Sequence, residues 1–192
     1  CVKDAVTSPF WSSCIRMATK SASSSAAISA FFAVFEVIAG YRRFVLGDCT
    51  VTHNTVMALK IVEMIQKKTL ILVHKEFLMN QWIERIEEFL PGARVGKIQA
   101  SVCDCDNKDI VIGMIQTMYN KTFPQEVYSQ FGLTIIDEVH RIGSEEFSKT
   151  LLKTITPCML GISATVERKD KLTKLLYMFI GPKIHSMLRK QE

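Results

Sequence analysis

The segment Leu133-Thr-Ile-Ile-Asp-Glu-Val-His140 joins a short apolar run to two adjacent carboxylates, Asp137 and Glu138. Leu133–Ile136 has the composition of a strand buried on both faces of a parallel sheet, and packing gives such a strand no reason to end in acids. In open α/β sheets, however, ligands bind beyond the carboxyl ends of the strands. Carboxylates there suit Mg²⁺, which prefers oxygen ligands, and a second acid can orient the water that attacks a γ-phosphate. A solvated turn is the alternative interpretation of an isolated Asp-Glu pair.

Helix and strand patterns alternate on both sides of this segment. Some stretches repeat apolar residues at helical spacing, whereas others are short continuous apolar runs that indicate buried strands. This alternation predicts a three-layer α/β sandwich around a mostly parallel sheet. The predicted helices cover Thr55–Gln66, Phe77–Leu90, Phe147–Ile155 and Lys169–Ile180, and the predicted strands cover Thr69–Val73, Val95–Ile98, Asp109–Gly113, Leu133–Ile136 and Met159–Ser163.

The composition is that of an ordinary globular protein. The chain has 192 residues, of which 48% are hydrophobic and 22% charged, so one domain with a buried core is expected. The net charge of +5 suits a polyanionic partner without requiring one. The longest apolar run, Ala26–Tyr41, is interrupted by Ser29 and Glu36 and is too short for a membrane span. We therefore expect no membrane partner.

The six cysteines form no CxxC pair and have no histidine at zinc-finger spacing. Scattered reduced thiols of an intracellular protein are therefore the expected state. Cys103 and Cys105 are separated by one residue, which leaves a shared metal ion or a disulfide as the alternative.

Four ordered boxes resemble the first ATPase domain of superfamily 2 helicases. Asp137-Glu-Val-His140 resembles the Walker B box DExH, and Gly161-Ile-Ser-Ala-Thr-Val-Glu-Arg-Lys-Asp170 resembles the SAT box. Thr69–Trp82 looks like the strand, loop and helix that meet the nucleic-acid backbone, and Asp109–Met118 is similar to the next strand and turn of that domain. The resemblance covers roughly residues 55–192 and is strongest to the repair and transcription branch found in large DNA viruses and phages.

This resemblance implies a RecA-like P-loop NTPase domain with ATP and Mg²⁺ as cofactors. It also implies an intracellular location, in the cytoplasm, the nucleus or the viral factory of a large DNA virus, rather than secretion. It implies DNA as the partner, with RNA left open, and a second RecA-like domain and an N-terminal part that this chain lacks. Thr55 and Asp137 would hold Mg²⁺, and Glu138 would act on the attacking water. His140 would link the nucleotide site to the nucleic-acid face, together with the SAT residues Ser163, Ala164 and Thr165.

The resemblance also implies a set of residues near the nucleic-acid backbone, where contacts position a strand without reading its sequence. For Lys75, an ordinary solvated loop lysine is the alternative, and Trp82 is expected to be a core residue rather than a stacking platform. Val166 stands where the family usually has proline, which alters a turn rather than a catalytic group. The implied backbone contacts are Lys75, Gln81, Gln116 and Thr117.

The phosphate loop that such a domain requires is incomplete. In GxxxxGK[ST], backbone N–H groups wrap the phosphates, Lys reaches the β- and γ-phosphates, and Ser or Thr binds Mg²⁺. Thr55 stands where the last residue of this motif belongs, yet Val51-Thr-His-Asn54 precedes it without Gly-Lys. A degenerate or frameshifted loop is one explanation.

A second explanation is that Arg43–Asn54, followed by Thr55, resembles the carboxyl-terminal splice junction of an intein. Inteins end in His-Asn and are followed by Cys, Ser or Thr. The resemblance implies that the Asn54 side chain cyclises onto the Asn54 backbone carbonyl and cleaves the following peptide bond. His53 would either polarise that carbonyl or protonate the leaving amine. The Thr55 hydroxyl would accept the upstream segment as an ester. Insertion between the Lys and Thr of a phosphate loop would leave the observed sequence.

The predicted organisation therefore has three parts. Residues 1–39 are unassigned, as a decayed intein, a split-intein half or a misread frame, and Cys1 is either an intein nucleophile or a chance terminal cysteine. Residues 40–54 form the splice segment, read as two short β segments around a Gly47-Asp48 turn. Residues 55–192 form the helicase ATP-binding domain, which we expect to have negligible ATPase activity alone. The rival functions are a protein-splicing element with helicase cargo and a non-catalytic nucleic-acid-binding module.

Overall fold

The computed structural model describes residues 42–47, 51–141, 143–163 and 173–186. Within those residues, no helix has the length and apolarity needed to cross a bilayer. The elements in chain order are β1 (Arg43–Gly47), α4 (Val51–Ile65), β2 (Thr69–Val73), α5 (Glu76–Phe89), β3 (Val95–Gln99), β4 (Val102–Cys103), β5 (Ile110–Met114), α6 (Ile115–Asn120), α7 (Gln125–Ser129), β6 (Leu133–Asp137), the 3₁₀ turn η1 (Val139–Arg141), α8 (Glu145–Lys153), β7 (Cys158–Ser163), α9 (Thr173–Phe179) and β8 (Lys183–Ser186).

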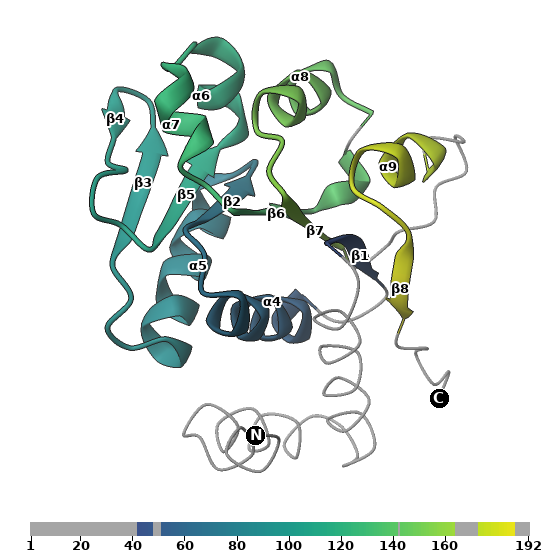
Figure 1. Ribbon diagram of the computed structural model, residues 1–192, viewed down its shortest axis with the longest axis horizontal. Helices are drawn as coiled ribbons and strands as arrows, with labels where there is room; N and C mark the ends of the chain where they lie inside the picture. Colours follow the sequence, from purple (N-terminus) through teal and green to yellow (C-terminus); the bar gives the residue numbers. More distant parts are fainter. Residues whose placement is uncertain (1–41, 48–50, 142, 164–172, 187–192) are drawn as a thin grey trace.

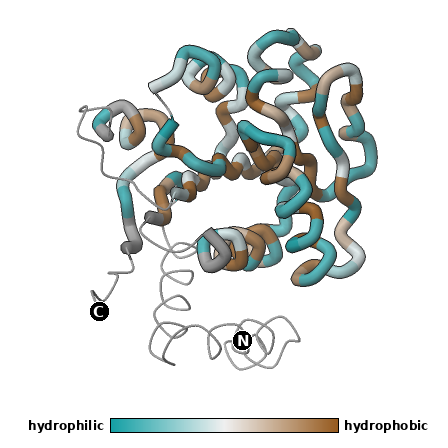
Figure 2. Tube along the Cα trace, turned by 180° about the vertical axis from the view of Figure 1, so that it is seen from behind, coloured by the Kyte–Doolittle hydropathy of each residue, from teal (hydrophilic) through white to brown (hydrophobic). Residues whose placement is uncertain are grey.

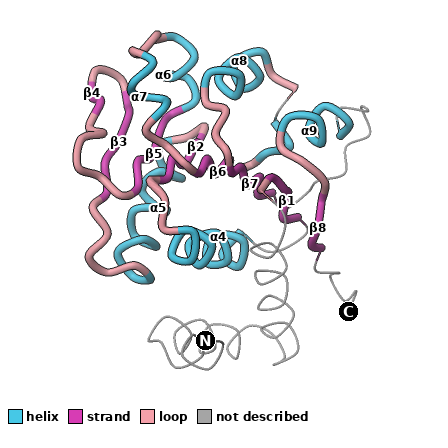
Figure 3. Tube along the Cα trace, in the orientation of Figure 1, coloured by secondary structure: helices cyan, strands magenta, loops and turns pink. Residues whose placement is uncertain are grey.

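These strands form one sheet in the order β4-β3-β5-β2-β6-β7-β1-β8. Every neighbouring pair is parallel except β3 and β4, which pair antiparallel at one edge. Helices α4 and α5 cover one face of the sheet, and α6, α7, α8 and α9 cover the other (Figures 1 and 3). The predicted three-layer α/β fold with a mostly parallel sheet is confirmed.

The core lies on both faces of the central strands. All five residues of β2, β5 and β6 are buried. Successive side chains of β2 point to opposite layers, so Ile71 packs with α4 and α5 while Leu70 packs under the helices of the other face. Figure 2 shows hydrophobic residues concentrated along the strands of the sheet, whereas the surrounding helices and loops contain more hydrophilic ones. The prediction that continuous apolar runs form strands buried on both faces of the sheet is therefore confirmed.

The second β segment predicted within residues 40–54 is wrong. The first segment exists as β1, but α4 begins at Val51, so residues 51–54 are helical. The reason is that β7 and β8 already pair with both sides of β1, so no antiparallel strand of a hairpin can lie beside it. Valine and threonine lose less than about 1 kcal/mol each in a helix, a cost that tertiary context overrides.

Other differences concern the ends of elements and short elements. α8 begins at Glu145 rather than Phe147 because the Ser144 hydroxyl caps it, accepting the Phe147 N–H at 3.4 Å. The predicted helix over residues 169–180 is described only from Thr173, and its first residues lie outside the described range. The patterns predicted none of β4, α6, α7 and β8.

Candidate functional site

The register of the sheet brings four strand ends to one edge. Gly47 at the end of β1 pairs with Ser163 at the end of β7, and the preceding residue, Ile162, pairs with Asp137 at the end of β6. Ile136 in turn pairs with Leu72 near the end of β2. Because all these strands run in the same direction, their carboxyl ends form a single rim, which is where open α/β sheets bind ligands.

The first turns of α4 lie against this rim. The Asn54 side-chain amide donates to the Ser163 carbonyl at 3.3 Å, and both residues are almost fully buried. The adjacent Thr55 is also buried, at 7% exposure, and follows the same turn of the helix. The structure therefore brings Thr55 and Asp137 to the same edge of the sheet. His53 lies in α4, but its side chain is outside the described part of the chain.

Asp137 is a buried carboxyl group, only 5% exposed. Its Oδ2 accepts the indole N–H of Trp82 at 2.9 Å, and its Oδ1 accepts the Glu138 N–H at 2.9 Å. The pKa of Asp137 is raised to about 6, mainly by burial and also by the nearby Glu138 charge, although the hydrogen bond from Trp82 acts in the opposite direction. Among the described residues no lysine or arginine pairs with Asp137. A buried carboxylate in this position favours a cation.

Glu138 and His140 form a second polar group next to Asp137. Glu138 has a positive φ of 54°, an uncommon conformation for a residue with a side chain. Its Oε2 lies 2.9 Å from His140 Nδ1, and the same nitrogen lies 2.9 Å from Ser163 Oγ. A carboxylate can only accept, so this contact favours the tautomer with the proton on Nδ1. The turn after β6 is thus tied to the end of β7.

The SAT box is described only in part. Ser163 ends β7, is 3% exposed and contacts His140, so the structure brings these two predicted residues together. Ala164, Thr165 and Val166 lie outside the described residues. The coupling role predicted for the box stays a prediction.

The predicted nucleic-acid residues follow the ends of two paired strands. Val73 of β2 pairs with Met114 of β5, and Lys75 and Gln116 each stand two residues beyond that pair. Both are exposed, as is Gln81 on α5, and the Lys75 ammonium lies 5.6 Å from the ring of Phe77. The Thr117 hydroxyl accepts the N–H of Ala100, which belongs to the turn between β3 and β4, and its predicted contact with nucleic acid stays a prediction. Thr117 therefore supports the hairpin of β3 and β4.

The sequence did not indicate two features of this edge. Trp82 is a core residue, 2% exposed, as predicted, but it is also the hydrogen-bond donor to Asp137. Buried indole N–H groups usually find a partner, and this is the signal that could have suggested it. His74 follows β2, and its Nδ1 is buried without a partner among the described residues. Burial, followed by the charges of Arg141, Lys75 and His140, lowers the pKa of His74 to about 4.

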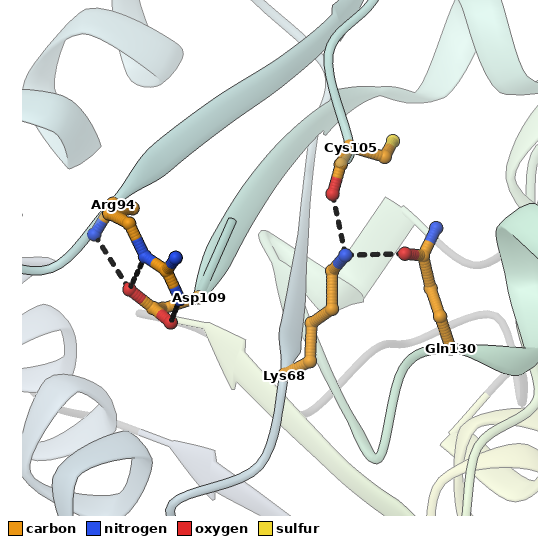
Figure 4. Close-up of polar contacts among 5 residues, drawn as sticks. All are labelled: Lys68, Arg94, Cys105, Asp109 and Gln130. Carbon is orange, nitrogen blue, oxygen red and sulfur yellow. Dashed lines mark hydrogen bonds and ion pairs between the residues drawn. The ribbon is translucent and has the colours of Figure 1, made fainter. Parts of the chain in front are cut away.

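A second group of polar contacts lies at the amino ends of the strands, opposite the end that carries Asp137 (Figure 4). Arg94 and Asp109 form a two-pronged ion pair, with Nη2 2.7 Å from Oδ1 and Nε 3.0 Å from Oδ2. Lys68 donates to the Cys105 carbonyl at 2.5 Å and to the Gln130 side chain. These groups precede β2 and β5, so they lie far along the strands from Asp137.

Comparison with known proteins gives the family. The model of the family described as type III restriction enzyme, res subunit, matches residues 27–168. The chain belongs to this family. The match contains both the Asp137-Glu138 turn and Ser163. Together with the relatives described next, it supports the predicted likeness to superfamily 2 helicases.

Several relatives are helicases or translocases by name. A candidate ATP-dependent RNA helicase of Acanthamoeba polyphaga mimivirus is 35% identical over 132 residues, which are 69% of this chain and 25% of that protein. A candidate ATP-dependent RNA helicase of African swine fever virus is 30% identical over 152 residues, 76% of this chain and 30% of that protein. The DNA 3'-5' translocase XPB2 of Sulfurisphaera tokodaii is 34% identical over 135 residues, 69% of this chain and 29% of that protein. The chain thus spans less than a third of these relatives.

Solved structures show the same fold. The UvsW helicase from bacteriophage T4 matches 81% of this chain and 58% of its own, with a TM-score of 0.68 and 22% identity. The Sulfolobus solfataricus SWI2/SNF2 ATPase core, solved in complex with dsDNA, matches 80% of this chain and 34% of its own, with a TM-score of 0.63 and 15% identity. These likenesses confirm the RecA-like fold.

Proposed function

We propose that this chain is the nucleotide-binding domain of a DExH-type, ATP-dependent helicase or translocase that acts on DNA. The observation that carries the proposal is the common rim, where the first turns of α4 meet the end of β7 while Asp137 and Glu138 end the neighbouring strand. In a parallel α/β sheet, a helix that follows a strand at this edge offers its N-terminal N–H groups to phosphates. The relatives that carry helicase names support the same activity.

The residues present fit a magnesium ion. Asp137 is a buried carboxylate without a cationic partner in the described chain, and the Thr55 hydroxyl group lies in the helix turn that meets the same rim. We assign these two as the ligands. Bound Mg²⁺ would neutralise charge on the phosphates of ATP. Glu138 would orient and polarise the attacking water, and His140 would transmit the state of this site to Ser163 through the contacts at 2.9 Å. The residues that would contact the nucleic-acid backbone are Lys75, Gln81, Gln116 and Thr117.

The test restores the phosphate loop in the chain as it exists. The triple substitution D48G/H53G/N54K produces the pattern GxxxxGKT ending at Thr55. Binding of Mg²⁺ and ATP to the native state would raise the free energy of unfolding by about 2.7 kcal/mol when ATP is at a hundredfold excess over its dissociation constant. The unfolding midpoint should therefore rise. The unaltered chain should show little shift. A restored chain that ignores ATP even at millimolar concentration would remove the nucleotide site from this edge.

Hydrolysis needs a second measurement, because we expect the arginine that completes the site to come from a second RecA-like domain. Fusion of the restored chain to such a domain should produce DNA-stimulated ATPase activity, which Glu138→Gln abolishes while ATP binding persists. Activity that survives Glu138→Gln would take that role from Glu138. If every variant bound single strands in a salt-dependent way and nucleotide did not change that binding, a non-catalytic binding module would be favoured instead.

A second candidate function is protein splicing at the Asn54–Thr55 bond. Its support is the run Gly47–Thr55, which lacks Gly-Lys but ends in His-Asn-Thr. Mass spectrometry after expression should then find a product that begins at Thr55, and Asn54→Ala should eliminate it. The burial of Asn54 and the hydrogen bond of its amide to Ser163 disfavour cyclisation in the folded chain. An intact mass after prolonged incubation, both folded and in urea, would end this alternative.

A further inference from the structure

Two cysteine thiols lie in contact at the end of the edge hairpin. Cys103 ends β4 and is exposed, whereas Cys105 is 4% exposed and packs in the core beneath the β3 edge. Their Sγ atoms are 3.7 Å apart, close to van der Waals contact. A disulfide needs about 2.05 Å between the sulfurs, so one side chain has to move by less than about 2 Å.

The backbone between these thiols is held in place. The Asp104 N–H donates to the Lys97 carbonyl at 2.9 Å, so the chain crosses β3 closely between the cysteines. Gly96 permits this approach, since a Cβ there would lie 2.1 Å from the Asp104 carbonyl oxygen. The thiols are therefore brought together by the fold of the hairpin as well as by their nearness in sequence.

Cys105 is anchored more firmly than Cys103. Its carbonyl accepts from the Lys68 ammonium at 2.5 Å, and the same ammonium binds the Gln130 side chain and lies 5.6 Å from the ring of Phe131 (Figure 4). In this view the Cys105 thiol points away from Lys68, on the other side of its backbone from the carbonyl. One thiol is thus open to small molecules, and the other is fixed behind it.

We propose that Cys103 and Cys105 form a dithiol–disulfide site that small-molecule disulfides, such as glutathione disulfide, oxidise reversibly. The order of events follows from exposure. The Cys103 thiolate attacks one sulfur of the small disulfide, whose S–S bond breaks and releases one thiolate. The Cys105 thiol then loses its proton to solvent, attacks Cys103 Sγ and releases the second thiolate. The protein loses two hydrogen atoms, and one small disulfide becomes two thiols.

The protonation of Cys105 supports this order. Burial, the hydrogen bond with Cys103 and the charge of that thiol raise the pKa of Cys105 to about 12. A thiol is a poor nucleophile until it is deprotonated, so Cys105 is unreactive towards an external disulfide at neutral pH. It reacts only after Cys103 carries a mixed disulfide, when the target sulfur is in contact with it.

The test uses the full chain in glutathione redox buffers. After quenching with iodoacetamide, tryptic digestion leaves both cysteines in one peptide, Ile98–Lys108. In the oxidised folded chain this peptide should be unalkylated and lack two hydrogens. The equilibrium constant for its oxidation should be at least about tenfold larger in the folded chain than in urea, because only the fold holds the thiols in contact.

Two variants make the outcome specific. Cys105→Ser should stop at a glutathione adduct on Cys103 under conditions where the unaltered chain closes its disulfide. Cys158→Ser is the matched control, since Cys158 is partly buried on β7 and should leave oxidation of the 98–108 peptide unchanged. Equal oxidation in the folded and denatured chains would overturn the proposal, as would a glutathione adduct of equal yield with and without Cys105. Neither outcome bears on the nucleotide site.

Discussion

Asp137 is a buried carboxyl group, so its ionisation should change the free energy of unfolding as the pH changes. Its pKa is about 6 in the folded state against 3.8 for the ordinary side chain. Between these values the folded state keeps a proton that the unfolded state has lost, so stability falls as pH rises from about 4 to 6. The loss should reach about 2 to 3 kcal/mol.

Asp137→Asn should remove this loss. We expect the unaltered chain to lose stability relative to Asp137→Asn between pH 4 and 7, as measured by urea unfolding at each pH. Asp109→Asn is a control of opposite sign, because Arg94 holds the pKa of Asp109 at about 2 and the carboxylate therefore stabilises the fold at neutral pH. Parallel pH profiles for the unaltered chain and Asp137→Asn would show that Asp137 has an ordinary pKa.

The indole of Trp82 should contribute through its N–H as well as through packing. Trp82→Phe keeps an aromatic ring in the core but leaves Asp137 Oδ2 without its donor, which should cost about 1–3 kcal/mol at neutral pH. A double-mutant cycle with Asp137→Ala, followed by urea unfolding, measures the coupling between the two side chains. A coupling energy near zero would mean that the two side chains are merely adjacent.

At the scale of single elements, α6 depends on a lysine from α8. Lys153 Nζ donates to the carbonyls of Met118 and Tyr119 at 3.2 Å and of Lys121 at 3.4 Å, which satisfies the carboxyl end of this short helix. Lys153→Met should therefore destabilise the chain by about 1–2 kcal/mol.

The control for this variant is Lys149→Met, on the same helix. Lys149 is exposed, pairs with Glu145 one turn earlier and lies 5.7 Å from the ring of Tyr119, so it contacts α6 without donating to its carbonyls and should contribute less than Lys153. Thermal unfolding of both variants separates the two cases. Equal destabilisation would show that the bonds to α6 add nothing beyond an ordinary surface pair.

Elements of different length were predictable to different degrees. The strands at Thr69–Val73 and Leu133–Ile136 were predictable because a parallel strand buried on both faces favours apolar residues at nearly every position, and the sequence shows that run directly. The short helices α6 and α7 span 6 and 5 residues, too few for a helical period to emerge. The start of α4 is not evident from the sequence, because its residues favour strands locally and the pairing of both sides of β1 is a tertiary feature that no local pattern shows.

The candidate site was predictable as a set of residues but not as a set of contacts. Asp137, Glu138, His140 and Ser163 follow from ordered boxes, and the structure brings them to one rim. The bond between Trp82 and Asp137 joins positions 55 residues apart, and the hydrogen bond from Asn54 to Ser163 spans 109. A local sequence pattern cannot show a contact between residues that are so far apart along the chain. The roles assigned to these residues remain predictions that the variants above examine.

At the scale of the whole molecule, one glycine lets the last described strand join the sheet. Gly181 has φ of 125°, and a Cβ there would lie 2.3 Å from the Arg43 carbonyl oxygen of β1. Gly181→Ala should therefore push β8 away from β1 and cost about 2–4 kcal/mol, since both the backbone conformation and the contact are unfavourable.

Gly92→Ala is the matched control for that variant. Gly92 also has a positive φ, 98°, but nothing lies within 4 Å of a Cβ built there. It should show only the cost of the backbone conformation, about 1–2 kcal/mol. Urea unfolding compares the two, and a Gly181→Ala variant as stable as Gly92→Ala would mean that the β1–β8 junction yields at no cost.

The indole that bonds Asp137 gives the molecule an optical reporter. The chain has two tryptophans, Trp11 and Trp82, so Trp11→Phe leaves a single emitter whose ring N–H touches the carboxylate assigned to the metal ion. Fluorescence from that ring should change in wavelength or intensity whenever Asp137 gains a proton or a cation. Occupancy of the rim could then be followed in real time without a labelled nucleotide.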